Sequence, residues 1–164
     1  MASGCRYKIV VFGAFGAGKT TLIQTLDPGS KHVEADCPGG TTTVALDFGR
    51  FESSGRLIFL FGTPGQERFE FAREIIAKGM DGALLLIDAS TPVDDFSRQL
   101  YASLSGSKIP FMVLLNKWER TPGYADQIRQ EFAGATMCPI TAIDQKSSSD
   151  VLAGFVATLP QKDT

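Results

Sequence analysis

Residues 13–20 read GAFGAGKT, and they join an apolar run at residues 7–12 to a helical pattern at residues 19–26. This stretch matches the pattern G-x-x-x-x-G-K-[ST], in which glycines let several backbone N–H groups converge on one anion. The N-terminus of the helix adds partial positive charge, the Lys19 ammonium can reach the outer phosphate oxygens, and the Thr20 hydroxyl can ligate Mg²⁺. The stretch therefore predicts a strand, a phosphate-binding loop and a helix in direct succession.

The apolar runs elsewhere in the chain predict a sheet that is buried on both faces. They are continuous rather than alternating, which is typical of parallel strands covered by helices. We expect strands at residues 7–12, 43–51, 57–61, 83–87, 111–115 and 136–140. Helical patterns lie at residues 19–26, 67–78, 93–104, 125–132 and 148–159. Proline and capping residues support several of their ends.

This order predicts one α/β domain over residues 1–164. Its fold would be a single doubly wound, mostly parallel six-stranded sheet with one antiparallel edge strand. That edge strand is residues 43–51, which lead through Ser53, Ser54 and Gly55 into the next strand as a hairpin. Residues 31–43, KHVEADCPGGTTT, are expected to form a loop. We find no internal repeat and no linker that would divide the chain.

The composition excludes several classes of protein. The chain has 43% hydrophobic residues, 21% charged residues and a net charge of -2, so neither disorder nor general nucleic-acid binding is expected. Cys5, Cys37 and Cys138 match neither a zinc site nor a disulfide framework. No signal peptide, lipidation pattern or integral membrane segment is recognised. We expect a cytoplasmic protein; acylation of Cys5, which would allow transient membrane association, is an open alternative.

Three further segments follow predicted strands. They are FGTPGQERF at residues 61–69, NKWE at residues 116–119 and ITAID at residues 140–144. Ligands of doubly wound sheets lie outside the carboxyl ends of the strands, so all four segments are expected around one site. Together they resemble the small Ras-like GTPases over residues 8–159. The resemblance implies a GTP-binding and GTP-hydrolysing molecular switch, with Mg²⁺ as cofactor and GTP and GDP as substrate and product.

The resemblance also assigns roles to individual residues. Asn116 and Lys117 would position the base and brace the phosphate loop, and Glu119 would accept hydrogen bonds from guanine N1–H and N2–H₂. Ala142 would donate its backbone N–H to the guanine carbonyl oxygen. The residues expected to bind nucleotide are Gly13, Ala14, Phe15, Gly16, Ala17, Gly18, Lys19, Thr20, Thr21, Gly65, Asn116, Lys117, Glu119, Thr141, Ala142 and Ile143.

Two segments are expected to respond to the γ-phosphate. Gly65 would donate its backbone N–H to it and Gln66 would orient the attacking water, so the segment through residue 71 would order and disorder with the nucleotide. The other switch is expected between residues 26 and 44. There Thr43 is our candidate to bind Mg²⁺ with Thr20, and Thr42 is the second choice. The predicted catalytic residues are thus Gln66, Lys19 and Thr43.

Some positions depart from the family pattern. Gly62 stands where the family usually carries an aspartate that holds Mg²⁺ through water. Asp47, on the neighbouring strand, is our candidate to replace it as an indirect Mg²⁺ partner; the alternative is an acid that faces solvent. Glu119 replaces an aspartate, which could weaken guanine selectivity. Phe15 stands where an arginine finger from an activating protein would enter.

The absence of an acid at position 62 is shared with a prokaryotic branch similar to the gliding-motility polarity switches and the Roadblock-associated ATP/GTP-binding proteins. That resemblance implies a regulatory or effector protein, for which a Roadblock or longin-type partner is a candidate. The apolar residues Phe69, Phe71, Ile75 and Ile76 would either dock such a partner or pack onto the sheet. Two other functions stay open: a nucleotide-binding scaffold with little hydrolysis, and a small ATP-dependent kinase.

The remaining charged residues near these segments receive no catalytic role. Arg68 and Arg73 are interpreted as solvated or partner-facing residues of the helix that follows Gln66. His32, the only histidine, is interpreted as a surface loop residue. The sequence therefore predicts a site made from the phosphate loop, the three later segments and one candidate acid, Asp47.

Overall fold

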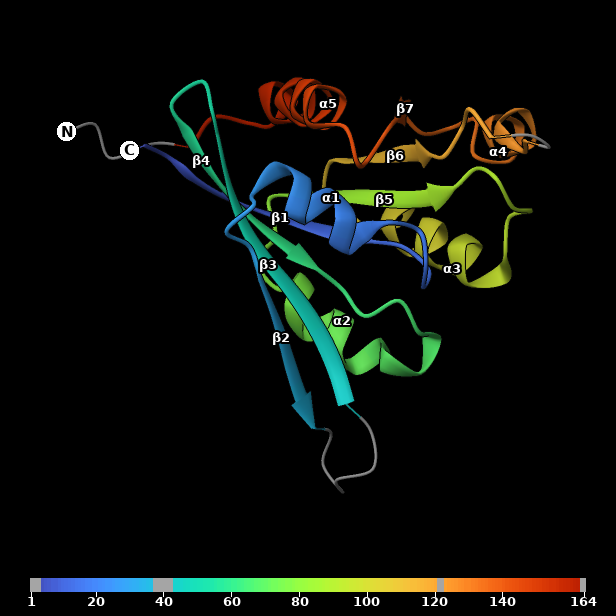
Figure 1. Ribbon diagram of the computed structural model, residues 1–164, viewed down its shortest axis with the longest axis horizontal. Helices are drawn as coiled ribbons and strands as arrows, with labels where there is room; N and C mark the ends of the chain where they lie inside the picture. The colour runs from blue at the N-terminus through green and yellow to red at the C-terminus, as the bar shows by residue number, and fades with distance from the viewer. Residues whose placement is uncertain (1–3, 37–42, 121–122, 163–164) are drawn as a thin grey trace.

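The structure is a computed structural model that describes residues 4–36, 43–120 and 123–162, and a single mixed sheet with helices on both faces dominates it (Figure 1). The elements are β1 (Arg6–Phe12), α1 (Lys19–Leu26), β2 (Lys31–Asp36), β3 (Thr43–Ser53), β4 (Arg56–Gly62), a 3₁₀ turn η1 (Glu67–Phe69), α2 (Glu70–Ala77), β5 (Gly82–Asp88), α3 (Asp95–Ser105), β6 (Phe111–Asn116), α4 (Ala125–Glu131), β7 (Met137–Ile140) and α5 (Gln145–Thr158). Over the described residues the strand order is β2-β3-β4-β1-β5-β6-β7. The predicted α/β class and mostly parallel sheet are confirmed.

One edge of the sheet differs from the prediction. Residues 31–36, expected as loop, form β2, so the sheet has seven strands in the described part of the chain rather than six. β2 pairs antiparallel with β3, and β3 pairs antiparallel with β4, so β3 is not an edge strand. Residues 31–34 are exposed. A solvated edge strand needs no apolar pattern because its backbone pairing and charged side chains are enough, and the sequence signal was therefore weak.

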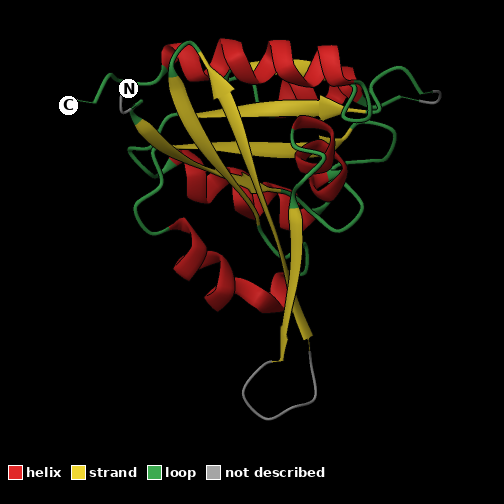
Figure 2. Cartoon of the chain, turned by 60° about the vertical axis from the view of Figure 1, so that its left-hand side comes forward, coloured by secondary structure: helices red, strands yellow, loops and turns green. Residues whose placement is uncertain are grey.

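Two layers of helices explain why the central strands are apolar along their whole length (Figure 2). In β1, Ile9 and Val11 pack with residues of α1 and α5. The alternate residues Val10 and Phe12 pack with residues of α3 and α4 on the opposite face. Burial of each large aliphatic side chain contributes about 1.5–3 kcal/mol, which fixes the register of this strand.

Capping carboxylates set the beginnings of two helices. α5 begins at Gln145, three residues before the predicted start, because Asp144 Oδ2 accepts a hydrogen bond from Ser147 N at 3.3 Å. α3 begins at Asp95, two residues after the predicted start, since Asp94 Oδ1 accepts from Ser97 N at 2.6 Å. None of the helices in the described ranges combines the length and apolar character that a membrane span requires.

Gly49 lets α1 lie close to β3. A Cβ atom at this position would stand 2.8 Å from Ile23 Cγ2 and 3.3 Å from Asp27 Cβ. Ile23 is fully buried, so its methyl group has no free space to move into. Thr20 lies in the first turn of α1, and Asp47 lies two residues before Gly49 on the same side of β3. The close approach therefore brings these two side chains together.

We predict that Gly49→Ala lowers the free energy of unfolding by about 1–3 kcal/mol, because the added methyl group overpacks the contact with Ile23. Gly154→Ala is the matched control, since Gly154 lies on the exposed face of α5 and a Cβ atom there meets nothing within 4 Å. The control should raise the free energy of unfolding by about 0.5–1 kcal/mol. Urea unfolding measures both. Shifts in the same direction would contradict the close-approach explanation.

Candidate functional site

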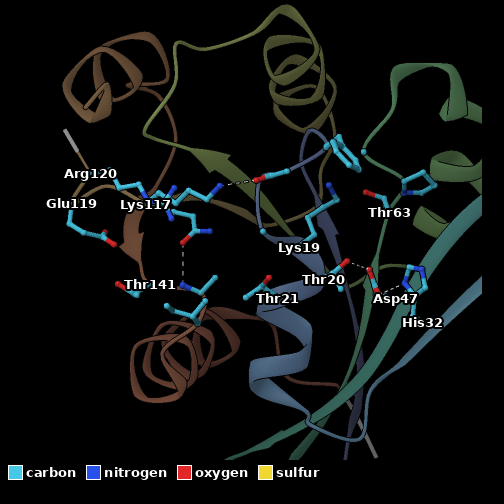
Figure 3. A pocket seen from close by; sticks show the side chains of 18 residues that line it. Lys19, Thr20, Thr21, His32, Asp47, Thr63, Lys117, Glu119, Arg120 and Thr141 are labelled. Carbon is cyan, nitrogen blue, oxygen red and sulfur yellow. Dashed lines mark hydrogen bonds and ion pairs between the residues drawn. The ribbon is translucent and has the colours of Figure 1, made fainter. Parts of the chain in front are cut away.

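The four segments singled out in the sequence meet at the carboxyl ends of the parallel strands around a cavity of about 410 Å³ (Figure 3). The residues expected to bind nucleotide all line this cavity, except Gly13, Ala14 and Ala17. These three contribute backbone carbonyls instead, to Lys19 and to Asn116. The cavity is of the size that holds small-molecule ligands.

Lys19 lies across the phosphate loop and is only 8% exposed. Its Nζ donates hydrogen bonds to Gly13 O at 2.6 Å and to Ala14 O at 2.9 Å. Burial lowers the pKa of Lys19 to about 8; the Asp47 carboxylate acts in the opposite direction, and the Arg73 guanidinium lowers the pKa further. A buried ammonium that is held by neutral carbonyl groups is strongly stabilised by an incoming anion.

Asn116 connects three segments of the chain. Its Nδ2 donates to Ala17 O at 3.0 Å, and its Oδ1 accepts from Ala142 N at 3.2 Å. Gly18, at φ 107°, makes this contact possible, because a Cβ atom on Gly18 would stand 2.5 Å from Asn116 Nδ2. The side chain of Asn116 therefore joins the phosphate loop to the segment after β7.

Lys117, the residue after Asn116, also hydrogen-bonds to the phosphate loop. Its Nζ donates to Gly16 O and to Asp88 Oδ2, both at 3.1 Å. Its backbone has φ 61°, a left-handed conformation that is uncommon outside glycine. Burial of Asp88 acts to raise its pKa, but hydrogen bonds from Ser90 and Lys117 outweigh burial, and the pKa lies below the usual value. Our sequence reasoning missed Asp88, although an acid at the carboxyl end of β5 was a signal for it.

Asp47 faces the cavity from β3, so the solvent-facing alternative is wrong. It is 9% exposed, and its Oδ2 accepts from Thr20 Oγ1 at 2.6 Å (Figure 3). Its register partner on β4 is Gly62. A Cβ atom on Gly62 would stand 3.2 Å from Asp47 Cβ and 3.4 Å from Asp47 Oδ2. The Asp47 side chain thus occupies the space that a side chain at position 62 would need.

His32 lines the cavity and contacts the other oxygen of Asp47, although no motif in the sequence assigned it a role. Its Nδ1 lies 2.8 Å from Asp47 Oδ1, and its Nε2 lies 3.4 Å from Glu34 Oε1. The hydrogen bond to Asp47 is the main cause that raises the pKa of His32. Our interpretation of His32 as a loop residue was wrong because it depended on missing β2.

The oxygen atoms of Thr20 and Asp47 fit Mg²⁺, which prefers hydroxyl, carboxylate, water and phosphate oxygens. Thr43 begins β3, but its side chain lies outside the described part of the structure, as does the whole of Thr42. In the described residues, no group of three or more His, Cys, Asp and Glu side chains could hold a metal ion. Protein ligands to Mg²⁺ are commonly few, with the remainder supplied by water and substrate phosphates.

Gly65 packs directly on the phosphate loop after β4. Its carbonyl oxygen accepts from Phe15 N at 2.9 Å, and a Cβ atom on Gly65 would stand 2.9 Å from Lys19 Nζ. The exposed side chain of Gln66 is not brought into the cavity lining, and its Oε1 accepts from Arg68 Nε at 2.8 Å. The structure therefore brings Gly65, but not the Gln66 amide, to the loop.

Arg73 differs from our interpretation as a solvated or partner-facing residue, because it is 7% exposed. Its guanidinium donates to Gln66 O at 2.6 Å and to Glu67 O at 2.9 Å, and it lies 4.7 Å from the centre of the Phe96 ring. Arg73 thus ties the backbone of the segment after β4 to α3.

The apolar residues of the same segment divide between the two alternatives named for them, packing onto the sheet and docking a partner protein. Phe69 is buried and Ile76 packs against the core. Phe71 and Ile75 are 47% and 61% exposed. Packing on the sheet therefore accounts for the first pair, and the second pair is available on the surface.

The end of the cavity opposite Asp47 is lined by Glu119, Arg120 and Thr141 (Figure 3), and Ile143 also lines the cavity. Glu119 and Arg120 are both exposed, and Ile143 is 78% exposed. Arg120 was missed from the sequence because it lies just beyond the NKWE segment. One end of the cavity is thus an amide-lined loop with a buried ammonium, and the other offers a carboxylate and apolar surface.

Comparisons with known proteins agree with this geometry. Residues 8–117 match the family described as 50S ribosome-binding GTPase. An uncharacterised protein of Methanocaldococcus jannaschii is 40% identical over 110 residues, which cover 67% of this chain and 69% of that protein. Translation initiation factor IF-2 of Gloeothece citriformis is 26% identical over 134 residues, but these cover 80% of this chain and only 12% of the factor.

Solved structures show the same fold at low sequence identity. The G domain of the Thermotoga maritima FeoB iron transporter matches with a TM-score of 0.68 and 21% identity, over 93% of this chain and 98% of that domain. Elongation factor SelB of Methanococcus maripaludis, in complex with the GTP analogue GppNHp, matches with a TM-score of 0.76 and 18% identity, over 99% of this chain and 36% of the factor. With the family match spanning more than half of its length, the chain belongs to this family of P-loop GTPases.

Proposed function

We propose that residues 1–164 act as one G domain, which binds guanine nucleotides and hydrolyses GTP as a molecular switch. The observation that carries the proposal is the meeting of the phosphate loop, the segment after β4, NKWE and the Thr141–Ile143 loop around one cavity of about 410 Å³. A phosphate chain fits the loop end, where Lys19 and the N-terminus of α1 provide positive charge. The base fits the end with Glu119.

In the proposed reaction, water adds to the γ-phosphorus, the bond to the β–γ bridging oxygen breaks, and GDP and inorganic phosphate leave. Lys19 neutralises charge on the outer phosphates, and Gly65 donates its backbone N–H to the γ-phosphate. Gln66 orients the water after exchanging its hydrogen bond with Arg68 for one to the water. Mg²⁺, held by Thr20 with Thr43 and Asp47 as further candidates, would supply positive charge at the phosphate oxygens.

Guanine selectivity would come from Glu119. Its carboxylate can accept from the N1–H and N2–H₂ groups of guanine, whereas adenine presents an acceptor at N1 and no amino group at C2. Glutamate is one methylene longer than the aspartate that the family usually carries. We therefore expect GTP and GDP to be preferred over ATP, with a smaller margin than an aspartate would give.

A nucleotide-binding scaffold with little hydrolysis is the second candidate function. The observation that favours it is the position of Gln66, whose side chain is held by Arg68 outside the cavity lining. Phe15 adds to this, because its ring is 84% exposed on the phosphate loop, where it would obstruct an arginine finger. Turnover would then be slow without a partner.

We also propose that the switch acts through a regulatory or effector protein. The exposed Phe71 and Ile75 on α2 support a docking surface beside the nucleotide. A Roadblock or longin-type partner, and a place in the Ras-like branch of the gliding-motility polarity switches, stay predictions from the sequence. So do cytoplasmic localisation and transient membrane association.

The proposed function is tested by competition of GTP, GDP and ATP for the purified protein, followed by measurement of phosphate release. We expect GTP and GDP to displace each other at lower concentrations than ATP, and Lys19→Ala to abolish binding. Gln66→Ala should slow phosphate release at least tenfold with unchanged GTP affinity, because it removes only the water-orienting group. Binding without phosphate release, in the wild type and with candidate partners, would instead favour the scaffold.

We predict that Asp47→Ala weakens Mg²⁺-dependent nucleotide binding by about 10–100-fold, because it removes the carboxylate beside Thr20. Asp126→Ala is the matched control: its carboxylate lies on α4, where the side chain is 96% exposed. Nucleotide dissociation rates over a Mg²⁺ titration measure the effect. Equal behaviour of the two variants would remove Asp47 from the proposed metal site.

Nucleotide affinity should depend on pH through Lys19. Its pKa is lowered to about 8, so about three-quarters of the free protein loses this proton at pH 8.5, while nearly all keeps it at pH 7. Phosphate binding favours the ammonium, and affinity should therefore be about fourfold weaker at pH 8.5 than at pH 7. The measurement is a binding titration with metal chelated. Lys19→Arg, which stays charged, should lose this dependence; wild-type affinity that stays constant or rises would contradict the assignment.

A further inference from the structure

His32 and Asp47 form a cross-strand pair at the edge of the cavity. They are register partners on β2 and β3, and His32 Nδ1 lies 2.8 Å from Asp47 Oδ1 (Figure 3). The other carboxylate oxygen, Oδ2, accepts from Thr20 Oγ1 at 2.6 Å. Two elements, α1 and the edge strand β2, therefore each supply a hydrogen-bonding partner to the same carboxylate.

These two hydrogen bonds fix the direction in which the Asp47 carboxylate points. An aspartate carboxylate rotates freely unless each oxygen has its own partner, and His32 and Thr20 are its hydrogen-bonding partners among the described residues. With an N–H donor on Oδ1, the Oδ2 atom is held toward Thr20. A carboxylate held in place in this way loses less entropy when it meets a cation or its hydration shell.

The imidazole of His32 is itself oriented by its own strand. Glu34 lies two residues further along β2, on the same face, and its Oε1 is 3.4 Å from His32 Nε2. The ring thus has a carboxylate at each nitrogen, and Nδ1 must carry a proton to bond to Asp47. Second partners of this kind set the orientation of groups around metal ions.

We propose that His32 is the positioning residue of the Mg²⁺ site. It holds Asp47 in the orientation that serves the cation, and through Asp47 it links the position of β2 to the occupancy of the site. The inference rests on the proposed function, since it assumes that Mg²⁺ accompanies a nucleotide in the cavity. It adds a residue that the sequence did not identify and a contact that reaches from the metal position to the edge of the sheet.

A role in stability alone is a poor explanation for this contact. The side chain of His32 is 43% exposed, and it belongs to neither apolar core. Its loss should therefore leave the packing of the sheet and α1 intact. The effect should appear in the response to Mg²⁺.

The experiment measures GDP dissociation from the full chain over a titration of free Mg²⁺, from full chelation to saturation. In His32→Ala, the Mg²⁺ concentration for half-maximal slowing should rise about tenfold, while the rate under chelation and the urea midpoint stay near the wild-type values. His32→Asn should recover most of the loss, because its amide can donate from a position close to Nδ1. Glu34→Ala, which removes only the longer contact, should have the smaller effect.

Two further measurements separate positioning from a general disturbance. In an Asp47→Ala background, His32→Ala should have no additional effect on the Mg²⁺ dependence. Because His32 is the only histidine, its ring ¹⁵N signals need no assignment. They should shift when Mg²⁺ is added to the GDP-bound wild type and stay unchanged in Asp47→Ala.

The inference is overturned if His32→Ala responds to Mg²⁺ as the wild type does, or if His32→Ala still changes the Mg²⁺ dependence in the Asp47→Ala background. It is also overturned if His32→Ala changes the GDP dissociation rate under chelation as much as it changes the rate with Mg²⁺. Normal GDP binding with any of these results refutes the inference and leaves the proposed function standing. Failure of the wild-type protein to bind GDP, with Mg²⁺ or without it, refutes the proposed function and the inference together.

Discussion

One amide side chain, that of Asn116, holds together the segments from which the site is made. Its two hydrogen bonds reach the phosphate loop at Ala17 and the segment after β7 at Ala142. Both bonds are buried, so losing either would leave a polar group unsatisfied, at a cost of about 1–3 kcal/mol. Lys117, the next residue, adds bonds to Gly16 and Asp88. The end of β6 is thus the anchor for the loop that would hold a phosphate chain.

Several polar groups of the phosphate loop and of the segment after β4 have hydrogen-bond partners within the protein. Lys19 donates to loop carbonyls, Phe15 N donates to Gly65 O, and Gln66 is bonded to Arg68. A phosphate chain would exchange these hydrogen bonds for others, and such an exchange costs far less than leaving groups unpaired. The contact between Gly65 and Phe15 directly couples the segment after β4 to the loop. Arg73 carries that coupling onward to α3 through Phe96.

At the Asp47 end of the site, strand β3 supplies the carboxylate that position 62 on the neighbouring strand β4 lacks. Gly62 has no side chain, and Asp47 from the adjacent β3 fills the space above it. In an antiparallel pair, directly opposite residues point to the same face of the sheet, so Asp47 can reach the region that a side chain at position 62 would have reached. Because the acid lies on β3 rather than β4, it is also next to β2, where His32 can contact it.

Local patterns in the sequence determined the central strands, the phosphate loop and the polar segments after β4, β6 and β7, because each of these depends on residues close together in the chain. The loop motif needs only the glycines, Lys19 and Thr20 in order, and the buried strands need only continuous apolar residues. These predictions located most of the cavity lining. The sequence also identified Asp47 as the candidate acid, but its direction could not be read from the strand pattern.

Only the tertiary structure decided the direction of Asp47, the contacts of His32, Arg73 and Asp88, and the existence of β2. Each depends on partners that are distant in the chain or on another element: Asp47 meets Thr20 across 27 positions, and Lys117 meets Asp88 across 29. A hydrogen bond between such residues leaves no periodicity in the sequence, because it is set by how the helices and strands pack. β2 escaped prediction for the same reason, since its stability comes from pairing with β3 rather than from its own apolar pattern.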